Sequence, residues 1–384
     1  MEMVTRSPQG RGALGGAYAL ASPFVGSLFD RLGPRAVMPW GSVLVGGGLA
    51  LSFFVSSLWH VYLFTGIFIG AGVALSGFAL NSAMLPRWFQ RKRGLATGVA
   101  LSGSGIGILL LIPAIERVIA GAGWRAAYLA YGLLILAGFV PAFRFLLRDR
   151  PEDVGQSLDG LPPAAGRPPA PERGHAEPLL RVMAGVRGER NFWVLAVIVF
   201  FIGANNNTVL SQLALYLTDA KFTTAAAALI FGSLGAIRMI GSMALGWASD
   251  RLGRQQAQAA AIAISAAGLA VLLLIPAMGS PAWMGWLFAV VYGIGMGGMG
   301  TFHSAMAADA YSGPSLGAVM CLLELFFGLG GTLGPLLAGL LFDWTGSYLI
   351  PFRAVLAGLC ASFFVALFMY RPPGRRREEN PATL

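Results

Sequence analysis

The sequence predicts an all-α polytopic membrane protein built from two pseudo-symmetric helical bundles. The 384-residue chain is 56% hydrophobic and 11% charged, whereas an average soluble domain carries about a quarter charged residues. Several apolar runs reach the roughly 20 residues that cross about 30 Å of hydrocarbon. A charged turn at the end of one apolar run is repeated later in the chain, and this repeat indicates two related halves.

The apolar runs place eleven spans in order along the chain. In the N-terminal part we predict spans at residues 12–30, 37–57, 60–85, 94–119 and 126–147. In the C-terminal part we predict them at 191–217, 224–248, 257–278, 282–308, 315–341 and 347–370. The intervening segment is rich in Pro and mixed charge, which predicts a solvated, extended linker. The expected domains are an N-terminal bundle at 1–147, a linker at 148–190, a C-terminal bundle at 191–371 and a tail at 372–384.

The distribution of basic residues predicts the orientation in the membrane. When the loops are assigned alternately to the two sides, one side receives most of the arginines, including those at 31, 35, 87–93, 251 and 254, the linker and the 371–377 tail. Cytoplasmic loops retain an excess of Lys and Arg. The linker and the C-terminus are therefore expected in the cytoplasm, and eleven spans place the N-terminus outside.

Composition also excludes several function classes. The net charge of +10 is dispersed over short loops, so it reflects topology and predicts no nucleic-acid partner. Cys321 and Cys360 lie inside apolar runs, and the three histidines are scattered. No metal site, cofactor or catalytic arrangement is expected from this pattern. The chain is therefore not expected to be an enzyme; its expected partners are a small-molecule substrate and the lipid bilayer, and it is expected to be a monomer.

The repeated turn carries a family resemblance. The first copy consists of Gly26, Asp30, Arg31, Gly33 and Arg35, and the second of Gly246, Asp250, Arg251, Gly253 and Arg254. The pattern is similar to the G-x-x-x-D-R-x-G-x-R/K loop between helices two and three in transporters of the major facilitator superfamily. That resemblance implies two six-helix bundles. Five spans in the first half then imply that helix one is missing. We expect a truncated reading frame or a mis-set start; the alternative is a remnant with impaired transport.

Further segments resemble particular branches of this superfamily. They are PRWFQRKRGLATGVALSGSGIG at 86–107, GWRAAYLAYG at 123–132, RDRPEDVG at 148–155 and GLGGTLGPLLAGLLFDWTGSY at 328–348. Together they look like the bacterial oxalate/formate antiporters and the monocarboxylate transporters, which move small organic anions. The resemblance implies a multi-pass protein of the bacterial inner membrane.

The motif copies are predicted to form a conformational latch. By resemblance, Asp30 faces the positive N-terminus of helix eleven, near residues 314–317, where the helix dipole favours a carboxylate. Arg31 and Arg35 are expected to add salt links. Such a latch stabilises the state closed to the cytoplasm and breaks when the site opens inward. The alternative is that these residues only anchor a loop and fix the topology.

Arg238 is the leading candidate for substrate binding. It lies near the centre of a predicted span, where a charge is expensive and usually faces a cavity or a partner. A guanidinium is a planar double donor suited to a carboxylate. The alternatives are an ion pair with Glu324 and a lipid-facing position. In the resembled branches the substrate arginine sits at the position of Ser242, one turn later, and a second basic residue on helix eleven is absent, so oxalate is disfavoured.

Other polar residues in the spans are candidates for coupling and for lining a cavity. Glu324 and His303 could each bind a proton, or each could be satisfied locally. Asn206 and Asn207, with Asn205, predict either a polar cavity lining or a break in their helix. Asn81 and Gln212 are similar cavity candidates. The sequence therefore predicts a secondary active transporter of a monocarboxylate-like anion that works by alternating access; the alternative is an exporter of hydrophobic drugs or neutral metabolites, in which Arg238 only pairs with Glu324.

Overall fold

The computed structural model describes residues 8–89, 93–160, 177–311, 313 and 315–370, which are helical and contain no strand. The predicted all-α fold class is confirmed for these residues. The N-terminal helices are α2 (Pro8–Leu32), α3 (Pro34–Leu51) with η1 (Ser52–Phe54), α4 (Leu58–Val61), η2 (Tyr62–Ile69), α5 (Gly70–Ser76), α6 (Phe78–Met84), η3 (Leu85–Arg87), α7 (Arg93–Pro141) and η4 (Ala142–Leu146). The segment from α4 to η3 occupies the place of one predicted span.

Helix α7 consists of two helices in sequence. It is 49 residues long, and Gly123 within it has φ 79° and ψ 170°, which is not helical. At a rise of 1.5 Å per residue, a straight helix of this length would be about twice as long as a membrane span. Glycine accepts the positive φ that reverses the chain here without steric cost. The break lies between the spans predicted at 94–119 and 126–147.

The C-terminal helices follow the predicted spans within a few residues. They are α9 (Arg190–Asp219), α10 (Thr224–Leu252), α11 (Arg254–Leu274), η7 (Pro276–Met278), α12 (Ala282–Ala310), α13 (Leu316–Thr345), α14 (Leu349–Phe364) and η8 (Val365–Met369). Helix α9 runs without interruption through Asn205, Asn206 and Asn207. The suggestion that these residues break their helix is therefore wrong, because asparagine side chains can bond within a helix without ending it.

The predicted linker is partly helical. In its described part it holds η5 (Pro151–Val154), η6 (Leu158–Gly160) and α8 (Leu179–Arg187), so the expectation of an extended chain is wrong there. Helix α8 buries Val182 and Val186 and contacts α13 and α2. Apolar residues four apart share one face of a helix, which explains why this stretch folds onto the bundle. Residues 161–176 and the predicted tail at 372–384 lie outside the described residues.

Nine helical segments of the described chain are long and apolar enough to cross a membrane. They are Pro34–Phe54, Leu58–Arg87, Ala114–Leu146, Arg190–Asp219, Thr224–Leu252, Arg254–Leu274, Ala282–Ala310, Leu316–Thr345 and Leu349–Met369. Helix α2 and the first part of α7 are not among these nine segments, which were sought only among the described residues. A multi-pass membrane protein is confirmed, whereas the exact number of eleven spans is not.

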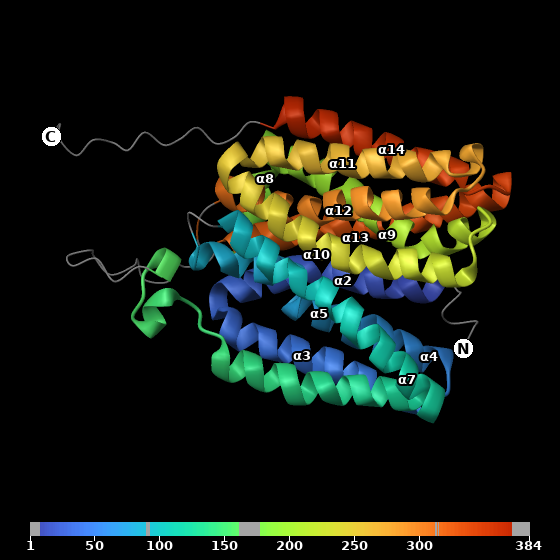
Figure 1. Cartoon of the computed structure of the whole chain (residues 1–384). Helices are drawn as coiled ribbons and strands as arrows, with labels where there is room; N and C mark the ends of the chain where they lie inside the picture. Colours follow the sequence, from blue (N-terminus) through green and yellow to red (C-terminus); the bar gives the residue numbers. More distant parts are fainter. Residues whose placement is uncertain (1–7, 90–92, 161–176, 312, 314, 371–384) are drawn as a thin grey trace.

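The two halves meet along two helix pairs. Helix α13 packs along α2, and α10 packs along α7, so that α2 lies next to the C-terminal helices in Figure 1. A Cβ added at Gly26 would lie 2.5 Å from the carbonyl oxygen of Gly317, and one at Gly98 would lie 2.3 Å from that of Ser242. Small residues let membrane helices approach this closely, so Gly26 and Gly98 allow the close packing of the two halves.

The two halves differ in how α13 and α7 are covered by other helices. On α13, a Cβ at Gly330 would meet the Phe200 carbonyl of α9 at 2.0 Å. On α7, a Cβ at Gly103 would meet nothing within 4 Å, and one at Gly107 would meet only Leu111 of the same helix at 4.0 Å. The face of α7 that carries Gly103 and Gly107 is therefore open within the described chain.

Candidate functional site

The first motif copy joins α2 to the start of α13. The carboxylate of Asp30 accepts hydrogen bonds from the backbone N–H groups of Gly317 at 3.0 Å and Ala318 at 2.8 Å. Its side chain is only 1% exposed, and the guanidinium of Arg87 lies 3.4 Å away. The first N–H groups of a helix lack intrahelical partners and carry partial positive charge. The predicted contact of Asp30 with the N-terminus of this helix is therefore confirmed.

The second motif copy joins α10 to the start of α7 in the same way. The carboxylate of Asp250 accepts hydrogen bonds from the backbone N–H groups of Gly94 and Leu95, both at 3.0 Å. No partner was predicted for this copy from the sequence. The repeat itself was the signal that could have found it, because the pseudo-symmetry of the halves exchanges α13 for α7.

The two copies lie at the same end of the molecule, here called the motif end. Arg254 bonds to Asp250 at 2.8 Å and to Asp309 at 3.2 Å, and Arg93 at the start of α7 also pairs with Asp309. Asp309 stands at the end of α12, just before the start of α13. These contacts bring the second copy close to the start of α13, in agreement with the topology that places both turns on one side.

The glycines that follow the Asp-Arg pairs make the turns. Gly33 between α2 and α3 has φ 86°, and Gly253 between α10 and α11 has φ 95°. A side chain is disfavoured at positive φ, which explains glycine at both places.

The motif arginines differ from expectation. Arg31 is exposed and forms no ion pair within the described residues. Arg35 donates its backbone N–H to Asp149 at 2.9 Å, and its guanidinium donates to the Arg144 carbonyl at 3.3 Å. The guanidinium of Arg251 stacks over the Trp247 ring at 4.0 Å. The predicted salt links of Arg31 and Arg35 to the latch are therefore not formed; Arg87 pairs with Asp30, and Arg254 pairs with Asp250.

Arg238 lies in the middle of α10, half-buried against α12. A Cβ at Gly293 of α12 would lie 3.6 Å from the Arg238 backbone nitrogen, and one at Gly297 would lie 2.3 Å from its carbonyl oxygen. Its charge acts on the hydroxyl of Tyr292. Among the described residues the guanidinium forms no hydrogen bond or ion pair. The ion pair with Glu324 that the alternative interpretation requires is not formed.

Helix α9 presents buried polar atoms beside α12. The amide oxygen of Asn205 accepts a hydrogen bond from the Tyr292 hydroxyl at 3.2 Å. Within the described chain, the amide nitrogen of Asn205 and the amide oxygens of Asn206 and Gln212 are buried without a hydrogen-bond partner. Buried polar groups are normally paired, so unpaired ones on one helix are candidates for contact with a ligand.

Two predicted cavity residues are engaged locally. The amide of Asn207 donates to the Gly203 carbonyl at 3.1 Å, and this side chain faces Gly331 of α13. The amide of Asn81 donates to the carbonyls of Ser76 at 3.0 Å and Gly77 at 2.8 Å. Asn81 thereby pairs carbonyl groups that lack helical partners where α5 ends and α6 begins, so its role here is structural.

Glu324 and His303 lie together in the interior. The His303 Nε2 atom is 3.8 Å from Glu324 Oε1, and both side chains are 4% exposed. The hydroxyl of Tyr18 in α2 donates to Glu324 Oε2 at 2.8 Å, and His303 Nδ1 lies 3.1 Å from the Met299 carbonyl. From the sequence alone, Glu324 and His303 were separate candidates, and Tyr18 was missed.

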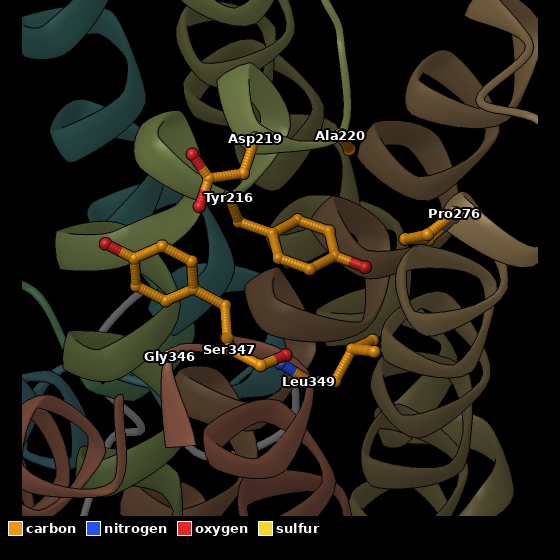
Figure 2. Close-up of a pocket in the computed structure, with 8 residues that line it drawn as sticks. Tyr216, Asp219, Ala220, Pro276, Gly346, Ser347 and Leu349 are labelled. Atoms are coloured by element: carbon orange, nitrogen blue, oxygen red, sulfur yellow. The ribbon is translucent and has the colours of Figure 1, made fainter. Parts of the chain in front are cut away.

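A separate pocket opens at the end opposite the motif end. It has a volume of about 220 Å³ and is lined by Tyr216, Asp219, Ala220, Pro276, Gly346, Ser347, Tyr348 and Leu349. Figure 2 shows the Asp219 carboxylate and the Tyr216 ring at its wall. None of the residues predicted for substrate binding or coupling lines this pocket.

Comparison with known proteins gives consistent relatives. The Major Facilitator Superfamily model matches residues 12–303 and 280–384. Monocarboxylate transporter 11 of Homo sapiens is 32% identical over 338 residues, which are 86% of this chain and 68% of that protein. Monocarboxylate transporter 12 of Rattus norvegicus is 27% identical over 383 residues, covering 94% of this chain and 76% of that protein.

A solved structure agrees with the fold. The crystal structure of the human organic anion transporter MFSD10 matches with a TM-score of 0.63 at 20% identity, over 94% of this chain and 83% of that one. The match to the family model, the paired helices and the repeated Asp contacts point the same way. The chain belongs to the major facilitator superfamily, whose members are transporters rather than enzymes, and within it is related to the monocarboxylate transporters.

Proposed function

We propose that the chain is a secondary active transporter that moves a small, monocarboxylate-like organic anion by alternating access. Two observations support this: its relatives are named monocarboxylate transporters, and a cation in the middle of α10 forms no ion pair within the described residues. Charges inside the membrane usually serve a partner or a pathway. An anionic substrate is a partner that would satisfy this one.

Arg238 is the proposed anchor for the substrate carboxylate. A guanidinium offers two parallel N–H donors that match the two oxygens of a carboxylate, and it keeps its charge when buried. The charge of Arg238 acts on Tyr292 of α12, and Asn206 and Gln212 on α9 offer further polar atoms. Asn207 and Asn81 are less favoured as substrate-binding residues, because their amides already donate hydrogen bonds to nearby carbonyls.

The Asp30 and Asp250 contacts are the proposed latch of the closed motif end. Each carboxylate in one half holds the start of a helix in the other half, so both contacts must break when the N-terminal and C-terminal bundles rock apart there. We place the motif end and the C-terminus in the cytoplasm, on the distribution of basic residues. The two relatives named above are from Homo sapiens and Rattus norvegicus, so a bacterial inner membrane is an expectation from sequence alone, as is a monomeric state.

Uptake into proteoliposomes tests the anchor. The purified chain is reconstituted, and a panel of radiolabelled short-chain monocarboxylates is supplied outside. We expect Arg238→Gln to lower kcat/KM for uptake by at least about 30-fold, because removing one partner of a buried charge pair costs about 2–5 kcal/mol. Arg238→Lys keeps the charge but lacks the two parallel N–H donors of the guanidinium, and it is expected to recover only part of the uptake.

The matched control is Arg353→Gln, which removes an exposed arginine of α14 and is expected to leave uptake unchanged. Undiminished monocarboxylate uptake by both Arg238 variants would exclude Arg238 as the anchor. The exporter of hydrophobic or neutral compounds lacks support here, because Glu324 bonds to Tyr18 and not to Arg238.

A further inference from the structure

One face of α2 and one face of α10 repeat each other over three helical turns. The positions are spaced by four residues and read Tyr18, Ser22, Gly26 and Asp30 in α2, and Arg238, Ser242, Gly246 and Asp250 in α10. Residues four apart lie on one side of a helix. The serine, glycine and aspartate are the same in both series, and only the first position differs, with a tyrosine in one half and an arginine in the other.

The partner helices show the same register. Asp30 receives the N–H groups of 317 and 318, and Asp250 receives those of 94 and 95. Counting seven residues into each partner helix gives Glu324 in α13 and Leu101 in α7. Tyr18 therefore meets a carboxylate, whereas the equivalent position opposite Arg238 holds a leucine. The repeat therefore has its acid, Glu324, in the pair of α2 and α13, and its cation, Arg238, in the pair of α10 and α7.

The carboxylate site is assembled from both halves of the molecule. Glu324 and His303 belong to the C-terminal helices α13 and α12, whereas Tyr18 comes from α2. The Phe78 ring of α6 also covers His303, with ring centroids 5.3 Å apart. Glu324 is 3% exposed, so in this closed state the N-terminal helices seal it from water.

Few other ionisable groups surround this carboxylate within the described residues. Cys321 lies one turn away on α13 and is fully buried, and Asp30 lies three turns from Tyr18 along α2, where it is bonded to the start of α13. The charge of Glu324 acts on Tyr18 and Cys321. No Lys or Arg pairs with Glu324 among the described residues; its polar neighbours there are the Tyr18 hydroxyl and the His303 ring.

We propose that Glu324 and His303 form the proton-binding site of the transport cycle and that Tyr18 is its positioning residue, present only while the motif end is closed. The inference rests on the proposed transport function. When the Asp30 latch breaks, α2 moves from α13, so Tyr18 leaves the carboxylate and water reaches it. A carboxylate that loses a hydrogen bond and gains water has a different proton affinity. Proton binding and opening are then linked, since each biases the same two states.

The test measures the pH dependence of uptake in proteoliposomes, with internal pyranine to report proton entry. Tyr18→Phe keeps the ring and removes the donor that favours the charged carboxylate. We expect its pH midpoint to move to higher pH by about one unit, from the typical strength of a hydrogen bond to a charged group. Glu324→Gln keeps a hydrogen-bonding side chain and is expected to abolish substrate-driven proton entry while substrate exchange persists.

The control is Tyr216→Phe, which removes a buried hydroxyl bonded to the Leu272 carbonyl at 2.8 Å near the opposite end. It is expected to leave the pH midpoint unchanged. An infrared titration of the carboxyl stretch gives a readout independent of transport: the titrating band should be absent in Glu324→Gln and shifted in Tyr18→Phe. An unshifted midpoint and band in Tyr18→Phe would overturn the proposal while leaving Arg238-dependent uptake standing; loss of all uptake in the wild type would instead overturn the proposed function.

Discussion

Replacing Asp30 by asparagine isolates the charge of the latch, because the two side chains have the same shape. The wild-type carboxylate accepts two backbone N–H groups at 3.0 and 2.8 Å and is 1% exposed. Asparagine keeps one acceptor oxygen and loses one charge-assisted hydrogen bond, which contributes about 2 kcal/mol. The population of the state open at the motif end is therefore expected to rise about 30-fold.

Cys321 provides the assay for this shift. It is fully buried in α13, and a Cβ added at Gly26 of α2 would lie 2.7 Å from the Cys321 Cβ. The thiol becomes accessible only when α2 separates from α13. In a Cys360→Ser background, which removes the exposed second cysteine, the rate of Cys321 labelling by a maleimide is expected to rise in proportion to the open population.

The matched control is Asp219→Asn, which changes an exposed aspartate at the opposite end and is expected to leave the labelling rate of Cys321 unaltered. Asp250→Asn should raise the rate as well, because the second latch holds the same two states. If Cys321 is labelled equally fast with and without the Asp30→Asn substitution, the Asp30 contacts do not hold the motif end closed.

Two further outcomes follow from the packing and the charges. Gly26→Val forces α2 away from the Gly317 carbonyl, 2.5 Å from the added Cβ, and should destabilise the detergent-solubilised protein by about 1–3 kcal/mol, whereas Gly47→Ala, which meets nothing within 4 Å, should not lower the melting temperature. Asp309→Asn leaves the Arg93 and Arg254 guanidinia facing each other without their shared acceptor, and should cost about 2 kcal/mol at low salt. Because salt screens both the lost attraction and the new repulsion, the difference in melting temperature from the wild type should shrink as ionic strength rises; a difference that grows would contradict this account.

Much of the fold was accessible from sequence because it depends on local properties. The length of the apolar runs predicted the spans. The family resemblance implied that Asp30 meets the start of helix eleven, which the contacts to Gly317 and Ala318 confirm. The roles of Arg238, Glu324 and His303 were inferred from the cost of polar groups in a membrane, and the structure places Glu324 beside His303.

Other features depend on contacts that no local pattern encodes. Tyr18 and Glu324 are 306 residues apart, and a tyrosine in an apolar run has no feature that distinguishes it from core. The cation beside Asp30 is Arg87 of η3, whereas Arg31, in the last turn of α2, is exposed. The number of spans also remained open, because the nine spanning segments are a count over the described residues alone.

The donors of both latches are main-chain N–H groups, and this has a consequence for mutational robustness. Replacing the side chain of Ala318 or Leu95 by another L-residue other than proline leaves its N–H in place. Random mutagenesis should therefore yield latch-defective alleles at the two aspartates, whereas at the half-buried Leu95 only a change to proline deletes the N–H. The other two donors, Gly317 and Gly94, are constrained by packing instead, because an added Cβ would lie 2.5 Å from Asp30 Oδ1 or 2.4 Å from Ser249 Oγ.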